Sequence, residues 1–341
     1  MSLSHCSHHQ LEDEYKKTDQ NESDMLKNLP REKGWTTEYV YQYQSVWLTP
    51  TFVKGVKLVQ QYFNAQSTDI LLATLPKSGT TWFKALIFSI MNRTRFDSPS
   101  HPLLTKGPHD CIPFLEYIIQ DERSYQDYQF SCLPRRLFAT HIPCPLLPAS
   151  VMSSGCKIVY VFRETKDVFV SNWHYMTKLR LKELPSFPIE DAFYLFCKGV
   201  SHFGPFWDHV LGYWKASLEN PENVIFLTYE DMKKDPVVCV MKLAKFLGKP
   251  FSLEEEREGV AQEIIRLCSF QNLSSLEVNQ SGLQHFSPHF AVENTHFWRK
   301  GQVGDWKNYM TLEMAQQLDE ITRQKLAGTS LIETLHVDTI T

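Results

Sequence analysis

The fold is decided by the stretch Ile70–Lys84, which reads ILLATLPKSGTTWFK. Its apolar run from Ile70 to Leu75 predicts a buried β-strand, and the apolar pattern that begins near Thr80 predicts a helix. A loop that leads from a strand into a helix presents free backbone N–H groups at the helix start, where the positive end of the helix dipole also lies. The stretch therefore predicts an anion-binding loop.

The loop also carries side chains that suit an oxyanion. Lys77 supplies a full positive charge, Gly79 permits close approach of the backbone, and Ser78, Thr80 and Thr81 supply hydroxyl groups. A Walker loop has a glycine separated by four residues from Gly-Lys-Ser/Thr. Here the order is Lys-Ser-Gly with no earlier glycine in the loop, which disfavours magnesium–ATP chemistry. An ordinary helix cap at Ser78 or Thr80 is the alternative interpretation.

The composition of the chain is that of an ordinary globular protein. Of its 341 residues, 43% are hydrophobic and 22% are charged, and the formal net charge is −4. A general nucleic-acid binder usually has a basic excess, so no nucleic-acid partner is expected. No stretch of about 18 apolar residues occurs, so no membrane partner is expected. The eight cysteines form no Cys-x-x-Cys pair, which favours reduced thiols and a cytoplasmic location.

We expect two parts in the chain. Residues 1–30 are polar, lack an apolar signal core and predict a disordered tail, with metal binding by His8 and His9 as an alternative. Residues 31–341 are expected to form a single domain. Within it, residues 270–305 are rich in polar side chains with little periodicity, which is typical of a functional or mobile loop.

Short apolar runs alternate with helical patterns in the expected domain. The runs that predict strands are residues 70–75, 135–140, 157–162 and 223–229, and the helical patterns are residues 80–93, those from about 166 onward, and 230–247. This alternation predicts an α/β fold with a central parallel sheet flanked by helices. Ligands of such sheets bind at the carboxyl ends of the strands. Lys77, His141, Arg163 and Tyr229, which end or follow the four strands, are therefore expected along one edge.

Two further clusters of the sequence suit phosphate groups. Arg163 ends one predicted strand, with Ser171 eight residues further on, and Arg299, Lys300 and Gly301 stand together near the C-terminus. Arginine binds phosphate oxygens in a bidentate manner. Surface ion pairs with nearby carboxylates and a solvated turn are the alternatives for the two clusters. Together with the loop they favour a ligand with anions at two ends, such as a nucleotide phosphorylated at two positions.

Three motifs, LPKSGTTWFKAL, YVFRETKDVFVS and RKGQVGDWKNYMT, together resemble those of the cytosolic sulfotransferases in order and spacing, over roughly residues 45–335. The segments PHDCIPFLE and FATHIP are similar to the plant branch, whose acceptors include flavonols, brassinosteroids, hydroxyjasmonates and desulfoglucosinolates. The resemblance implies a P-loop-like phosphosulfate-binding loop and 3′-phosphoadenosine 5′-phosphosulfate as the donor. No metal is expected, because side chains supply the cations and no Cys/His ligand spacing is visible.

The resemblance also implies which residues hold the donor. The residues implied for the 5′-phosphosulfate are Lys77, Ser78, Gly79, Thr80, Thr81 and Trp82. Those implied for the 3′-phosphate are Arg163, Ser171, Arg299, Lys300 and Gly301. Those implied for the adenine side are Trp82, Tyr229 and Phe270, with Ser269 beside Phe270.

His141 and Lys77 are the expected catalytic residues. A neutral histidine can accept the proton of the attacking hydroxyl, because its unperturbed pKa is roughly 6.5. Lys77 can stabilise the negative charge that grows on the departing 5′-phosphate. His141 follows the predicted strand RRLFAT and matches the catalytic histidine of the family, although on its own a structural histidine is the alternative. Many animal members have lysine two residues earlier, where this chain has Ala139, an alanine that plant relatives often share.

The acceptor is expected to be a small, hydroxylated and largely apolar molecule. By approximate match to pocket segments of the family, the resemblance implies Trp47, Phe114 and Tyr175 as candidates for its pocket, and core positions are the alternative for each. In the dimer motif of animal members, this chain has Gln316 in place of glutamate, so a monomer or a weak homodimer is expected.

Two other functions remain open at this point. A small-molecule kinase requires the Walker glycines and a carboxylate for magnesium, and neither is evident. A non-catalytic binder of 3′-phosphoadenosine nucleotides is the second alternative, and the intact Lys77 and His141 count against it.

Overall fold

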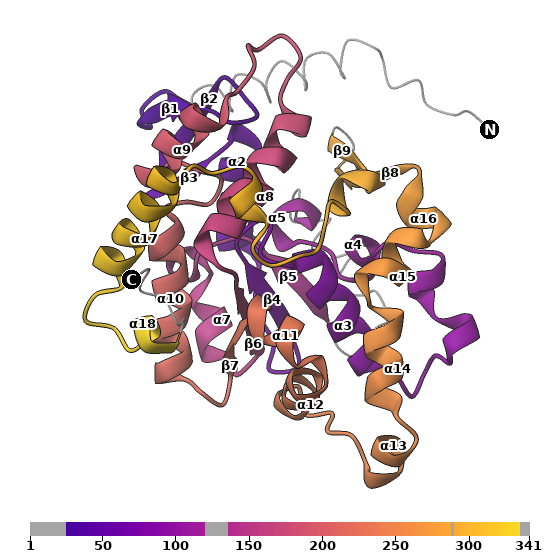
Figure 1. The fold of residues 1–341 in the computed structure, drawn as a ribbon. Coiled ribbons are helices and arrows are strands. Elements are labelled where there is room, and N and C mark those ends of the chain that lie inside the picture. The colour runs from indigo at the N-terminus through magenta and orange to yellow at the C-terminus, as the bar shows by residue number, and fades with distance from the viewer. Residues whose placement is uncertain (1–24, 120–135, 288–289, 335–341) are drawn as a thin grey trace, which may run out of the picture.

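A computed structural model describes residues 25–119, 136–287 and 290–334, so the predicted tail lies outside the described residues up to residue 24. Met25, Leu26 and Leu29, at the end of that tail, pack against the hydrophobic core. The centre of the molecule is a four-stranded parallel sheet with helices on both faces, which confirms the predicted α/β class (Figure 1). Its strands, in spatial order, are β5 (Leu137–Thr140), β4 (Ile70–Thr74), β6 (Lys157–Phe162) and β7 (Val224–Thr228).

The side chains of the central sheet divide between two hydrophobic clusters. In β4, Leu71 and Ala73 join one cluster, whereas Ile70 and Leu72 join the other, because successive side chains of a strand point to opposite faces. The helices packed in the first cluster are α2 (Pro50–Tyr62), α8 (Thr165–Leu179), α9 (Ile189–Cys197), α10 (Phe206–Glu219) and α17 (Leu312–Leu326). Those in the second are α3 (Thr80–Asn92), α12 (Pro236–Phe246) and α14 (Val260–Leu267). Burial on both faces explains why the strands are continuous apolar runs.

Smaller elements surround this core. An antiparallel sheet consists of β1 (Arg31–Lys33), β2 (Tyr39–Tyr43) and β3 (Val46–Leu48), and a hairpin consists of β8 (Leu283–Ser287) and β9 (Phe290–Glu293). The short helices are α4 (Pro108–Cys111), α5 (Leu115–Ile118), α7 (Ala149–Ser153), α11 (Tyr229–Lys234), α13 (Leu253–Arg257), α15 (Phe270–Ser275), α16 (Glu277–Gln280) and α18 (Leu331–Thr334). Within the described ranges, no helix is both long and apolar enough to cross a bilayer.

The order of the strands places a binding crevice at the end of β4. Strand β4 pairs with β5 on one side and with β6 on the other. The connection after β4 therefore leads toward one edge of the sheet, and the connection after β5 leads back past β4 toward the other edge. Ligands of doubly wound sheets bind at such a switch point, outside the carboxyl ends of the strands. Lys77 follows β4 and Arg163 follows β6, and the Nη1 atom of Arg163 donates to the carbonyl oxygen of Lys77 at 3.2 Å.

Three local predictions differ from the structure. The helix expected over residues 230–247 is two helices, because Pro236 opens α12 and Asp235 caps it by accepting from the backbone N–H of Val238. Strand β5 begins at Leu137, and Arg135 lies outside the described residues. The expected loop at residues 270–305 was wrong in part, since this range contains α15, α16 and both strands of the β8–β9 hairpin, elements too short to show periodicity.

Candidate active site

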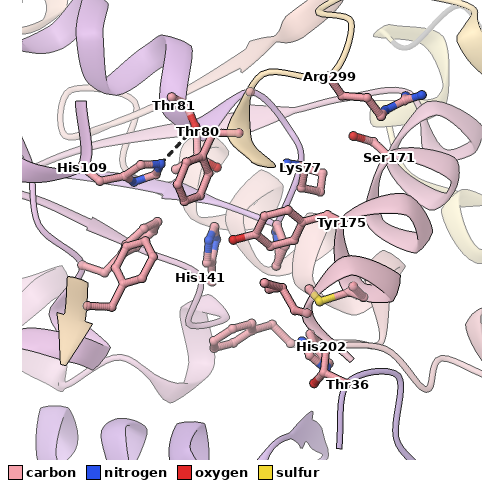
Figure 2. A pocket seen from close by; sticks show the side chains of 18 of the residues that line it. Thr36, Lys77, Thr80, Thr81, His109, His141, Ser171, Tyr175, His202 and Arg299 are labelled. Atoms are coloured by element: carbon pink, nitrogen blue, oxygen red, sulfur yellow. Dashed lines mark hydrogen bonds between the residues drawn. The ribbon is translucent and has the colours of Figure 1, made fainter. Parts of the chain in front are cut away.

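A cavity of about 310 Å³ lies at the carboxyl edge of the central sheet. One residue that follows or ends each parallel strand lines it, namely Lys77 after β4, His141 after β5, Arg163 after β6 and Tyr229 after β7. The parallel sheet therefore brings together the four residues that were expected along one edge. Figure 2 shows Lys77 and His141 beside the Tyr175 side chain inside this cavity.

Most of the residues singled out from the sequence line the cavity: Lys77, Gly79, Thr80, Thr81, Trp82, Phe114, His141, Arg163, Ser171, Tyr175, Tyr229, Phe270, Arg299, Lys300 and Gly301. Three do not line it. Ser78 is only 1% exposed and lies in the turn closed by its own backbone N–H to Leu75. Ser269 caps α15, where it accepts from the backbone N–H of Asn272. Trp47 belongs to the core instead of a pocket, because β3 pairs there with Gly204.

The loop after β4 is held in an unusual backbone conformation. Lys77 has a φ of 71° and Gly79 a φ of 100°, both in the left-handed region. A non-glycine residue in that region costs about 1–3 kcal/mol and is typical of ligand-binding loops. A Cβ atom on Gly79 would lie 2.8 Å from Cδ2 of Tyr229. The glycine is therefore required both for its conformation and for close packing of the loop on Tyr229.

Lys77 is the most perturbed cation at the cavity. Burial, followed by the positive charges of Arg163, Arg299 and Lys178, lowers the pKa of Lys77 to about 7. Its Nζ atom lies 4.1 Å from the ring centroid of Tyr175, a distance at which an ammonium interacts with an aromatic face. The neighbouring positive charges repel a proton on Lys77, and a bound anion would offset that repulsion. The cluster is therefore suited to bind an anion.

Arg163 joins the loop to the C-terminal basic segment. Its Nη1 atom donates to the carbonyl oxygen of Lys77 at 3.2 Å, and Nη2 donates to the carbonyl oxygen of Gln302 at 2.8 Å. Its Nη2 also lies 3.5 Å from Asp167, so the predicted alternative of an ion pair is present too. The Nε atom is buried and has no hydrogen-bond partner among the described residues. The guanidinium group therefore keeps at least one donor, Nε–H, that no described residue engages.

Two buried carboxylates hold the segment that carries Arg299 and Lys300. Asp305 accepts from Arg299 at 2.5 Å and from Lys300 at 2.9 Å, and these contacts lower the pKa of Asp305 to about 2 despite its burial. Asp167 accepts from the backbone N–H groups of Gly304 at 2.7 Å and Trp306 at 3.1 Å. The segment is therefore fixed by α8 and by its own carboxylate, beside the cavity.

A second cavity of about 190 Å³ continues from the first. Trp82, Tyr229, Phe270 and Trp298 border both cavities, and Ser269 borders the second. Within the described residues, the indole Nε1 atoms of Trp82 and Trp298 are buried without a hydrogen-bond partner. Aromatic faces with free donors suit a flat, nitrogen-rich ring. Trp298 had no role in the sequence analysis, because nothing in its segment distinguishes it from a core tryptophan.

The tautomer of His141 follows from its contacts. The Nδ1 atom lies 2.7 Å from the carbonyl oxygen of Thr74, and a carbonyl oxygen can only accept, so Nδ1 carries the hydrogen. The lone pair of the neutral ring therefore resides on Nε2. Burial is the main cause that lowers the pKa of His141 to about 3. The imidazole is neutral across the physiological range and can accept a proton at Nε2.

Glu116 supports His141 and was not singled out from the sequence. Its carboxylate accepts from the backbone N–H of His141 at 2.8 Å and from the hydroxyl of Thr140 at 2.9 Å. Burial raises the pKa of Glu116 to about 7. Glu116 lies in PHDCIPFLE, a segment that was used only to identify the branch of the family. The similarity of this segment to the plant branch was visible in the sequence, but the contact of Glu116 with His141 was not.

Two more histidines at the cavity were missed. His109 lies beside Thr81, with 3.2 Å between Nε2 and Oγ1, and His202 lies beside Thr36, with 3.3 Å between Nε2 and Oγ1. Figure 2 shows the two pairs at well separated places around the cavity. In the described part of the chain, no group of three or more His, Cys, Asp or Glu side chains is arranged to hold a metal ion.

Comparison with known proteins shows similarity along most of the chain. Residues 67–330 match the family described as the sulfotransferase domain. Flavonol 3-sulfotransferase of Flaveria bidentis is 47% identical over 312 residues, which cover 91% of this chain and 99% of that protein. Cytosolic sulfotransferase 13 of Arabidopsis thaliana is 44% identical over 307 residues, which cover 89% of this chain and 91% of that protein.

Solved structures share the arrangement described above. A putative steroid sulphotransferase of Arabidopsis thaliana superimposes with a TM-score of 0.71 at 37% identity, covering 97% of this chain and 99% of that chain. A mouse sulfotransferase complexed with PAP superimposes with a TM-score of 0.67 at 26% identity, covering 87% of this chain and 97% of that chain.

Proposed function

This chain belongs to the sulfotransferase domain family and is an enzyme of the transferase class, and we propose that it transfers a sulfuryl group from 3′-phosphoadenosine 5′-phosphosulfate to a hydroxyl of a small, largely apolar acceptor. The observation that carries the proposal is that the anion loop, the cationic clusters and a neutral histidine of fixed tautomer all face one cavity. The complex of the mouse relative with PAP supports the choice of donor.

The residues around the cavity fit a nucleotide with anions at both ends. Among the described residues, the buried Nε atoms of Arg163 and Arg299 have no hydrogen-bond partner, so both can donate to a phosphate. A Cβ atom on Gly79 would lie 2.8 Å from Tyr229, and one on Gly301 would lie 2.5 Å from Phe270. Only glycine therefore fits at these two positions beside the cavity. When bound, the donor supplies an activated sulfuryl group at the loop and adenine at the aromatic second cavity.

His141 is the proposed general base. Its Nε2 lone pair accepts the proton of the acceptor hydroxyl while the acceptor oxygen forms its bond to sulfur. The bond from Nδ1–H to the carbonyl oxygen of Thr74 stabilises the imidazolium that forms, and the carbonyl keeps the ring in one orientation. A base with a low pKa in the free enzyme becomes stronger when a nearby negative charge favours its protonated form.

Lys77 is the proposed group that stabilises the departing phosphate. As the bond between sulfur and the bridging oxygen breaks, the electron pair stays on that oxygen, and the ammonium of Lys77 lies among the cations that meet the charge. Loss of such a group typically lowers the rate by about a hundredfold to a thousandfold. Positioning and electrostatics supply the remaining catalysis, as in phosphoryl transfer.

The acceptor is proposed to bind at the apolar end of the cavity. Its wall there contains Phe52, Phe114, Tyr117, Phe203, Phe286 and Phe290. Phe114 packs against His141, with 4.7 Å between the ring centroids, so an aromatic surface leads directly to the base. The Thr36–His202 pair is a polar contact within this wall. Flavonols and steroids, named in the relatives, are the acceptor classes to test first.

The alternatives are weaker on the same observations. A kinase is disfavoured by the Lys-Ser-Gly order of the loop, which lacks the Walker glycines. A non-catalytic nucleotide binder would have no use for the buried hydrogen bonds around His141, which fix its tautomer and its backbone. A cytoplasmic location is supported by relatives that are named cytosolic sulfotransferases. A monomer or weak homodimer stays a prediction.

Nucleotide binding tests the donor site without an acceptor. Isothermal titration of the wild-type protein is expected to show adenosine 3′,5′-bisphosphate binding at least about tenfold more tightly than adenosine 5′-monophosphate, because the 3′-phosphate gains charge-assisted hydrogen bonds. Arg299→Met should reduce that ratio and leave the weaker nucleotide nearly unaffected. Equal affinity for the two nucleotides in the wild-type protein would contradict the proposed donor.

A further inference from the structure

Lys84 is a buried lysine that the proposed reaction does not use. It lies on α3, is 0% exposed, and forms no ion pair with a carboxylate in the described part of the chain. Its Nζ atom lies 3.1 Å from Nδ1 of His109 and 3.3 Å from the ring centroid of Phe114. A buried amine is costly unless it is bonded. The bond to His109 is therefore its main polar contact.

His109 connects this amine to the anion loop. It lies on α4 and is 7% exposed, with its ring packed between Phe114, at 5.6 Å, and Phe297, at 4.4 Å, measured between ring centroids. Its Nε2 atom lies 3.2 Å from the hydroxyl of Thr81, the contact marked by the dashed line in Figure 2. Burial and the charge of Lys84 lower the pKa of His109 well below its ordinary value. A neutral ring must donate at one nitrogen and accept at the other.

The direction of these bonds follows when Lys84 donates. An ammonium has no lone pair, so Lys84 donates to Nδ1 of His109, which leaves Nε2–H to donate to the oxygen of Thr81. The hydrogen of the Thr81 hydroxyl is then free to point at an anion in the cavity. Burial lowers the pKa of Lys84, but a bound polyanion favours its charged form. The reversed direction would leave only lone pairs of Thr81 facing the anion.

We propose that Lys84 and His109 are positioning residues that hold the hydroxyl of Thr81 as a hydrogen-bond donor to the 5′ end of the nucleotide. This inference rests on the proposed function, since the anion in question is the 5′ group of the donor. Neither residue touches the reacting atoms. Both act through Thr81, which is the second residue of α3 and follows Gly79 of the loop by two positions.

A double-mutant cycle separates this role from simple packing. Affinity for adenosine 3′,5′-bisphosphate is measured by isothermal titration in the wild-type protein, Lys84→Met, Thr81→Val and the double variant. Each single change is expected to weaken binding by about tenfold, the worth of one hydrogen bond to a charged group. The double variant is expected to bind no more weakly than Thr81→Val, because the relay ends at that hydroxyl.

A matched background supplies the control. In Thr81→Ser, which keeps the hydroxyl, Lys84→Met should again weaken binding by about tenfold. His109→Phe replaces Lys84→Met in the same cycle if the methionine variant does not fold. If Lys84→Met weakens nucleotide binding in Thr81→Val by the same factor as in the wild-type protein, the two residues act independently. That result would overturn the relay while leaving the proposed donor site intact. If the wild-type protein binds no nucleotide, both the relay and the proposed function are overturned.

Discussion

The Nδ1 atom of His141 lies 2.7 Å from the carbonyl oxygen of Thr74, the last residue of the neighbouring strand β4. This bond joins the end of β5 to the start of the anion loop, since Lys77 follows Thr74 by three positions. The base and the loop are therefore placed by the same pair of parallel strands. A displacement of either strand end would move the base relative to the group that holds the sulfuryl donor.

The neutral state of His141 gives the first prediction. Because burial holds its pKa at about 3, its imidazole is expected not to titrate in the free protein between about pH 5.5 and pH 8, where an exposed histidine does. The measurement is a nitrogen-15 NMR titration of histidine-labelled protein, with the signal assigned by its loss in His141→Gln. The shifts should show hydrogen on Nδ1 and a lone pair on Nε2. A midpoint near 6.5, or hydrogen on Nε2, would show that the base is set up differently.

The second prediction concerns the pH dependence of nucleotide binding. Lys77 has a pKa of about 7 in the free protein, and a bound anion favours its charged form. The fraction of charged Lys77 falls as the pH rises through 7, so affinity for adenosine 3′,5′-bisphosphate should fall by up to about tenfold per pH unit above that value. Titration calorimetry across this range should show the slope in the wild-type protein and its loss in Lys77→Met. A slope that persists in Lys77→Met would assign it to another group.

The third prediction concerns the carboxylate behind the base. Glu116→Ala removes the acceptor of two buried donors, which costs roughly 1–3 kcal/mol for each donor left unpaired. The variant should unfold at a lower temperature and lose most of its transfer rate, because the backbone of His141 loses its hydrogen bond. Glu116→Gln is the control, since an amide oxygen still accepts from His141. Equal losses in both variants would mean that charge, and not the hydrogen bond, is what matters.

The fourth prediction compares two glycines of the C-terminal basic segment. Gly301 and Gly304 have φ values of 62° and 81°, so alanine is strained at both. A Cβ atom on Gly301 would lie 2.5 Å from Phe270, whereas nothing lies within 4 Å of one on Gly304. Gly301→Ala should therefore weaken binding of adenosine 3′,5′-bisphosphate by about tenfold, the effect of a modest overpacking penalty. Gly304→Ala should lower the stability of the fold and leave the affinity for adenosine 3′,5′-bisphosphate unchanged. Equal affinities would show that Phe270 moves aside without cost.

Local patterns predicted the sheet and the residues at its edge. Apolar runs of strand length that alternate with helical patterns carry enough information to place Lys77, His141, Arg163 and Tyr229 together, because parallel strands end at the same edge. One helix was predicted over residues 230–247, although Pro236 was already a signal in the sequence for a new helix start.

The contacts between distant segments could not be predicted. Glu116 supports His141 from 25 residues away, and His109 bonds Lys84 from 25 residues away, so neither pair shows in a local pattern. Trp47 was assigned to the pocket by approximate match to pocket segments of the family, and a single aromatic residue in the sequence does not show whether it packs in the core or lines a cavity. Burial of a lysine likewise has no signature in a helix that is otherwise apolar.

The most direct test of the account is transfer of sulfur-35 from labelled 3′-phosphoadenosine 5′-phosphosulfate to a panel of flavonols, hydroxysteroids and hydroxyjasmonates, followed by mass analysis of the product. We expect at least one acceptor to gain one sulfuryl group. His141→Gln should lower its rate by at least about a hundredfold and leave the affinity for adenosine 3′,5′-bisphosphate unchanged. Tight nucleotide binding with no labelled product from any acceptor, or full activity in His141→Gln, would contradict the account.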